Sequence, residues 1–161
     1  MSGTRRIAFW VVVAVQALLL VSLIGFNELA LAKGDEVTLR TAPVDPIDLF
    51  RGNYVTLRYE ISTLQVQDGL RPGDAVYVPL HESGGAWTGS FGYASPPPQG
   101  KFIRGTIHQA DSHRTTIDYG IETYYADADE AERLQSAGTL LVTLRIDHGG
   151  RARISRVEPV R

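Results

Sequence analysis

The spacing of apolar and polar residues divides the chain into two parts. Residues 7–26 form a continuous apolar run, IAFWVVVAVQALLLVSLIGF, whose clear polar interruptions are Gln16 and Ser22. After Lys33 the pattern changes to short stretches of alternating apolar and polar residues, separated by Gly, Pro and Asp. A continuous apolar run is typical of a membrane helix, whereas a period of two is typical of β-strands. The pattern therefore predicts an N-terminal apolar helix followed by a β-rich domain.

The apolar run has the length and the flanking charges of a membrane anchor. Its twenty residues, at a helical rise of about 1.5 Å each, match the roughly 30 Å hydrocarbon core of a bilayer. Arg5 and Arg6 precede the run and Glu28 follows it, so the positive-inside rule places the N-terminus in the cytoplasm. We expect a single-pass protein of the cytoplasmic (inner) membrane, with its C-terminal domain in the periplasm or the extracellular space.

The expected organisation follows from this topology. We expect a cytoplasmic N-terminus over residues 1–6, a transmembrane anchor over 7–26, a linker over 27–35 and an extracytoplasmic domain over 36–161. A cleavable signal peptide is the alternative, because residues 30–32 read Ala-Leu-Ala, the small-x-small form that signal peptidase accepts. The apolar run is longer than the usual core of a signal peptide, which favours the uncleaved anchor.

Alternation locates the strands of the domain. The clearest one covers residues 54–61, where Val55, Leu57, Tyr59 and Ile61 share the face expected to be buried. The opposite, solvent-facing set is Tyr54, Thr56, Arg58 and Glu60. Further strands are predicted over residues 36–41, 75–78, 102–107, 115–119, 140–146 and 152–157, the last two as a terminal hairpin.

Two other segments depart from this pattern. Asp127 as N-cap, Glu130 as capping-box partner and Gly138 as C-cap predict a short helix between them. Residues 81–100 contain five glycines, three consecutive prolines and Trp87, and are expected to form a long irregular loop. The fold class expected is mainly β, with antiparallel sheets or a partly open barrel, one short helix and the N-terminal transmembrane helix.

Composition narrows the chemistry. The chain has 161 residues and no cysteine, which excludes disulfides, thiolate zinc sites and cysteine nucleophiles. Its formal net charge is −2, so the domain lacks the positive field of a nucleic-acid-binding protein, and nucleic acid is not expected as a partner.

The string Gly52-Asn53-Tyr54-Val55-Thr56-Leu57-Arg58-Tyr59, called here the signature segment, resembles the signature of the GDYXXLXY protein family of membrane-anchored bacterial proteins. Residues 43–51, PVDPIDLFR, and residues 119–125, YGIETYY, also resemble the family. Asn53 stands where the signature has aspartate, which keeps the turn propensity and removes the charge. The resemblance implies no biochemical activity, but it implies a companion of other membrane proteins. The residues to which it gives structural roles are Asp45, Pro46, Asp48, Gly52, Asn53, Tyr54, Leu57 and Tyr59.

No complete catalytic or metal-binding constellation emerges. His108, Asp111 and His113 have superficially metal-like spacing but fall on an expected hairpin turn. A serine–lysine hydrolase would need a serine motif beside Lys33 or Lys101, and neither lysine has one. The remaining hydroxyl and carboxyl candidates are Ser62, Ser83, Ser90, Ser95, Asp45, Asp48, Asp74 and Glu82. We therefore predict no catalytic residues, no metal and no cofactor.

A binding surface is the preferred hypothesis, because Tyr and Arg are common anchors of protein interfaces. It predicts a non-enzymatic, membrane-anchored interaction module whose partner is another integral membrane protein. A β-rich envelope hydrolase on a signal-peptidase-like scaffold and a domain that senses a small ligand under the Trp87 loop are the alternatives. The candidate binding residues are Arg51, Tyr54, Thr56, Arg58, Glu60, Tyr124 and Tyr125.

Overall fold

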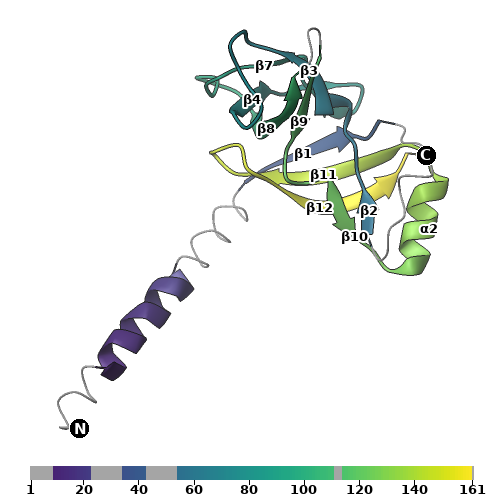
Figure 1. Cartoon of the computed structure of the whole chain (residues 1–161). Coiled ribbons are helices and arrows are strands. Elements are labelled where there is room, and N and C mark those ends of the chain that lie inside the picture. The colour runs from purple at the N-terminus through teal and green to yellow at the C-terminus, as the bar shows by residue number, and fades with distance from the viewer. Residues whose placement is uncertain (1–8, 23–33, 43–53, 111–113, 161) are drawn as a thin grey trace. The chain divides into compact units, whose positions relative to one another are not determined.

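The computed structural model describes residues 9–22, 34–42, 54–110 and 114–160. The chain forms two units, Met1–Lys33 and Gly34–Arg161. In the first unit residues 9–22 are helical, drawn as the purple ribbon in Figure 1. No helix in the described part of the chain is long and apolar enough to cross a membrane. The two ends of the predicted anchor, residues 7–8 and 23–26, lie outside the described residues.

In the second unit, one sheet is built from the first and last strands of the domain (Figure 1). Its centre is antiparallel, because β1 pairs with β11 and β11 pairs with β12. The hairpin of β5 and β6 extends it through a parallel contact between Leu39 and Trp87. The strands, in sheet order, are β12 (Ala152–Pro159), β11 (Leu140–Ile146), β1 (Asp35–Arg40), β6 (Ala86–Thr88) and β5 (His81–Ser83).

The second five-stranded sheet curls into a small barrel. Its two end strands meet at Tyr77 and Tyr93, whose backbones exchange hydrogen bonds of 2.8 Å in both directions. Gly92 makes this closure feasible, because a Cβ there would lie 2.6 Å from Cγ2 of Val76. The strands, in sheet order, are β4 (Ala75–Pro79), β8 (Phe102–Ala110), β9 (Thr115–Asp118), β3 (Thr63–Val66) and β7 (Phe91–Gly92).

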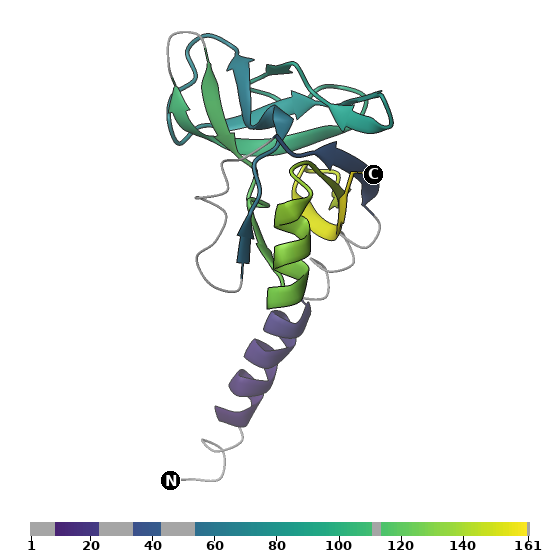
Figure 2. The ribbon, with the colours of Figure 1, turned by 90° about the vertical axis from the view of Figure 1, so that its right-hand side faces the viewer.

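A two-stranded ribbon and a helix complete the domain. The ribbon consists of β2 (Tyr54–Thr56) and β10 (Thr123–Tyr125), which run antiparallel. A 3₁₀ turn, η2 (Glu60–Ser62), lies between β2 and β3 in the chain and directly precedes β3. The helix α2 (Ala128–Ser136) follows β10, and Figure 2 shows it beside the ribbon.

All these elements share one hydrophobic core. The inward residues of β11 alternate as predicted, with Val142 and Leu144 fully buried, and Val37 and Leu39 of β1 lie buried beside them. Ala131 and Leu134 give α2 its buried face. The predicted helix boundaries are confirmed, since the Asp127 carboxylate accepts the Glu130 amide at 2.8 Å and Gly138 follows with a φ of +72°.

The expected fold class is confirmed in outline: the domain is mainly β, with a nearly closed barrel and one short α-helix among its described residues. The predicted irregular loop over residues 81–100 is wrong for residues 81–92. This stretch holds β5, β6 and β7, with Gly84 and Gly85 turning between β5 and β6 at positive φ. Most strand pairs are antiparallel, as expected, and two short contacts, β1–β6 and β3–β7, are parallel.

Candidate functional site

The inward residues of the signature segment, together with Ile61 just after it, contact residues 119–125. Val55, Leu57, Tyr59 and Ile61 are all at least 98% buried, as their alternation predicts. The predicted strand 54–61 is nevertheless too long, because β2 ends at Thr56 and residues 60–62 form the 3₁₀ turn. The Ser62 hydroxyl stabilises this turn by accepting the Tyr59 amide at 3.0 Å, a local bond that competes with strand pairing.

Tyr59 and Tyr119 connect the two segments reciprocally. The Tyr59 hydroxyl donates to the carbonyl of Ile121 at 2.7 Å, and the Tyr119 hydroxyl donates to the carbonyl of Ile61 at 2.7 Å. Both rings are buried, and burial together with the nearby Glu122 carboxylate raises the pKa of both phenols well above the ordinary value. The two phenols therefore stay protonated and act as structural donors. We call these two bonds the tyrosine clasp.

The ribbon extends the same connection. The Leu57 amide donates to the carbonyl of Glu122 at 2.7 Å, and β2 then pairs with β10 so that Tyr54 lies opposite Tyr125 and Val55 opposite Tyr124. Val55 faces the core, so Tyr124 does too. Its hydroxyl donates to the Glu130 carboxylate at 3.2 Å, and burial first, then Glu130, raises its pKa.

The predicted binding residues therefore separate into two groups. Thr56, Arg58 and Glu60 are exposed, as predicted, and we call them the signature face. Tyr125 is 77% exposed on the opposite strand. Tyr124 does not belong to this surface, because neighbouring residues of a strand point to opposite sides and its side chain packs toward the core.

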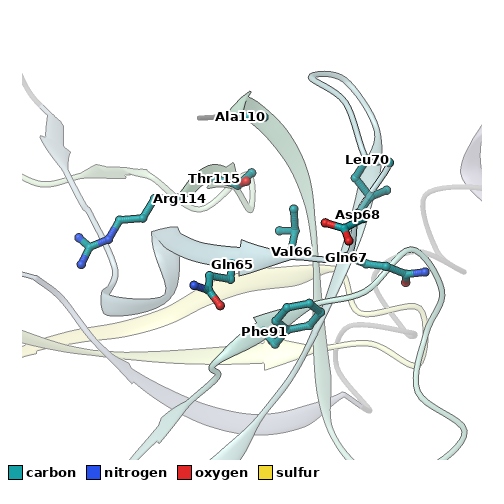
Figure 3. A pocket seen from close by; sticks show the side chains of 10 residues that line it. Gln65, Val66, Gln67, Asp68, Leu70, Phe91, Ala110, Arg114 and Thr115 are labelled. Carbon is teal, nitrogen blue, oxygen red and sulfur yellow. The ribbon is translucent and has the colours of Figure 1, made fainter. Parts of the chain in front are cut away.

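A groove lies beside the signature face. One hollow of about 540 Å³ is lined by Arg58, Glu60, Gln65 and Arg114 together with Ala42, Tyr59, Thr63, Leu64 and Ser90. A second hollow of about 700 Å³ shares Gln65 and Arg114 with the first and continues to the apolar side chains of Val66, Leu70 and Phe91. Gln67, Asp68, Gly69, Ala110 and Thr115 complete its lining (Figure 3). We call the two adjoining hollows the groove.

The groove was not predicted from the sequence. Arg114 is the last residue of a turn expected over residues 111–114, and nothing local relates it to the signature segment. The pairing of β3 with β9, in which Leu64 lies opposite Thr115, is what brings Arg114 next to Gln65.

The GDYXXLXY protein family matches residues 16–157. The chain belongs to this family. Neither a curated protein nor a solved structure shows a significant match. In this family member the inward residues of the signature make the contacts described above, and its outward residue Arg58 lines the groove. Residues 119–125, which also resemble the family, supply the partners of those inward residues, so the structure brings this segment together with the signature segment.

Several predicted residues lie outside the described part of the chain. These are Arg51 of the proposed surface, the structural candidates Asp45, Pro46, Asp48, Gly52 and Asn53, and the histidine-string members Asp111 and His113. The side chain of Tyr54 is likewise not described, although its backbone belongs to β2.

The chemical candidates that can be placed lie apart from one another. The Lys101 ammonium lies 3.5 Å from Asp35, donates to the Glu36 carbonyl at 3.2 Å and stacks 4.7 Å above the Trp87 ring. His108 Nδ1 lies 3.0 Å from the Asp118 carboxylate on the barrel surface. Within the described ranges, no three His, Asp or Glu side chains gather at one point as metal ligands would.

The other candidate groups have local roles or exposed positions. Asp74 accepts the Arg71 amide at 2.8 Å and so closes the turn before β4. Glu82 and Ser83 are exposed on β5, and Ser95 is exposed after β7. Ser90 alone of these lines the groove, so the first hollow combines two guanidinium groups, a carboxylate and small hydroxyls, an arrangement suited to binding a polar or charged group.

Proposed function

We propose that this family member is a non-enzymatic interaction module, anchored in the cytoplasmic membrane by its N-terminal apolar segment. In this proposal the β domain lies outside the cytoplasm and contacts another integral membrane protein through the signature face. The proposed topology rests on the uncharged run at residues 7–26 and on the arginines that precede it.

The observation that best supports the proposal is that inward and outward residues in and next to the signature segment have different surroundings. Leu57 and Tyr59 are buried and bond to residues 121 and 122, so they serve the fold. Arg58 and Glu60 alternate with them but contribute to no such packing. In the described part of the chain the Arg58 side chain has neither a hydrogen-bond nor an ion-pair partner. An exposed arginine beside a groove is a common anchor for a partner protein.

Partner capture from native membranes tests the proposal. The full-length protein, with an affinity tag, is solubilised in mild detergent, and retained proteins are identified by mass spectrometry. We expect one integral membrane protein to be retained reproducibly by the wild type and lost from the double variant Arg58→Glu with Glu60→Lys. This charge exchange leaves the net charge of the protein unchanged, so a general electrostatic effect is avoided.

A matched control separates surface recognition from non-specific charge effects. Arg151 and Glu82 are also exposed but lie away from the groove, on the β11–β12 turn and on β5. The double variant Arg151→Glu with Glu82→Lys should retain the partner. Capture of no membrane protein by the wild type, or equal capture by both double variants, would count against the proposed role of the signature face.

A further inference from the structure

The groove has a charged end and an apolar end. Arg58 and Arg114 line the first hollow, and both side chains are exposed to solvent. Val66, Leu70 and Phe91 line the second hollow and are half-buried, so each keeps part of its apolar surface accessible. Figure 3 shows Arg114 at one end of this second hollow and Leu70 at the other, with Val66 and Phe91 between them.

Among the described residues, the charged end lacks a full counter-charge. Two other arginines of this domain have carboxylate neighbours: Arg145 lies 3.6 Å from Glu36, and Arg156 lies 3.7 Å from Glu158. Arg58 and Arg114 have no such partner among the residues that the structure describes. Among the described residues that line this hollow, Glu60 is the only carboxylate beside the two arginines, and Asp68 lies in the second hollow. The electrostatic complement of this end is a carboxylate.

The shape of the groove favours a peptide over a small molecule. Small-molecule sites are usually concave and bury most of the ligand surface. Both hollows here open to solvent, and they adjoin at Gln65 and Arg114, which line both. An extended polypeptide fits such a groove, because it can place a carboxylate and a large apolar side chain at separate points along its length.

We propose that the groove binds an acidic segment of the partner protein. In this arrangement a carboxylate of the segment pairs with Arg58 and Arg114, while a neighbouring aromatic or aliphatic side chain packs on Val66, Leu70 and Phe91. Asp68 lies in the second hollow, so a second carboxylate is disfavoured there and a polar or basic residue is preferred. This inference rests on the proposed function, since it names the chemistry of the partner.

Selection from a random peptide library tests the groove directly, because it requires no identified partner. The full-length protein is held in lipid nanodiscs and exposed to a phage-displayed library of random peptides, with empty nanodiscs used to remove lipid binders. We expect enriched peptides to combine Asp or Glu with a large apolar residue. The affinity of a synthetic copy of the most enriched peptide is then measured by fluorescence anisotropy.

Substitutions localise the binding. Arg58→Gln and Arg114→Gln should each weaken the peptide about tenfold or more, because each removes a charge-assisted contact. Leu70→Ala should weaken it by a smaller factor, and Arg151→Gln should leave it unchanged. Raising the salt concentration should weaken the wild type more than either arginine variant. Thermal unfolding of each variant confirms that it is folded.

The outcomes separate this inference from the proposed function. Enrichment of peptides without acidic residues, no enrichment at all, or an affinity that neither arginine substitution changes would overturn the acidic-segment proposal. A partner captured from membranes could still depend on the signature face in that case, so the interaction module would stand. If no membrane partner is captured but the peptide binds through both arginines, the groove is confirmed and the membrane partner is not.

Discussion

On the outer face of the β1–β11–β12 sheet Arg145 has a carboxylate neighbour, whereas among the described residues the two arginines of the groove have none. On the sheet, Glu36 lies opposite Arg145 in register, and the hydroxyls of Thr38 and Thr143 meet at 3.3 Å on the same strands. In the groove, Arg58 and Arg114 have no partner within the described residues. We therefore expect a partner to bind at the groove, where arginines without a partner among the described residues lie beside accessible apolar surface.

The largest expected effect is a loss of stability in the core that leaves peptide binding unchanged. Leu144 of β11 is fully buried on the inner face of the sheet. Leu144→Ala should lower the free energy of unfolding by about 2–5 kcal/mol, because it leaves a cavity. Denaturant unfolding measures the loss. The most enriched library peptide, called here the groove peptide, should bind the folded fraction of this variant with wild-type affinity. A weaker affinity would show that the sheet and the groove are not independent.

The next largest effect is expected where the barrel closes, at Gly92. Gly92→Ala places a methyl group against Val76, which is fully buried, and should destabilise the domain by about 1–3 kcal/mol through overpacking. Gly92 follows Phe91, so this variant should also weaken the peptide, unlike Leu144→Ala. Gly69→Ala is not a suitable control, because Gly69 has a positive φ of 90°. An exposed position such as Ser95→Ala serves instead and should change neither quantity.

The tyrosine clasp has a smaller effect with a defined pH dependence. Tyr59→Phe and Tyr119→Phe should each cost about 1–2 kcal/mol, because a buried carbonyl loses its donor. Burial raises the pKa of both phenols, so only the unfolded chain releases these protons near pH 10. Stability should therefore fall as pH rises above about 10, by up to about 1.4 kcal/mol per pH unit for each tyrosine.

Denaturant unfolding between neutral and alkaline pH measures this dependence. Each phenylalanine variant should show a shallower decline above pH 10 than the wild type, since it lacks one titrating group. Equal slopes in the wild type and both variants would contradict the assignment of the clasp.

The smallest expected effect compares the two kinds of arginine directly. Arg145→Gln and Arg58→Gln should each change the free energy of unfolding by less than about 1 kcal/mol, because exposed ion pairs contribute little. Their effects on the groove peptide should differ, with loss only for Arg58→Gln. Parallel unfolding and anisotropy measurements test this, and a comparable loss of affinity for Arg145→Gln would remove the distinction between the surfaces.

Local alternation was sufficient to predict the core of the long strands. The inward residues of β11 and the inward residues of the signature segment are buried as expected, because side chains of an extended chain alternate between two faces. The same rule, applied to adjacent residues, would have separated Tyr124 from Tyr125. The end of β2 was not predictable in this way, since it depends on the hydroxyl of Ser62 closing a turn onto Tyr59.

Non-local pairing explains what the sequence did not reveal. The strands within residues 81–100 are two or three residues long, too short to show a period, and two of them pair with residues far away in the chain. Trp87 meets Leu39, and Phe91 meets Gln65. The groove depends on the same kind of contact, because Arg114 reaches the first hollow through the pairing of β9 with β3. Such contacts are visible only in the folded chain.

Site-specific photo-crosslinking in living cells tests the central claim most directly. A photoreactive side chain is introduced at Thr56 on the signature face, and in a separate variant at Arg133, an exposed position on α2. The account predicts that illumination joins the Thr56 variant to one integral membrane protein and that the Arg133 variant gives no such product. Crosslinks of equal yield from both positions, or none from Thr56, would contradict recognition through the signature face.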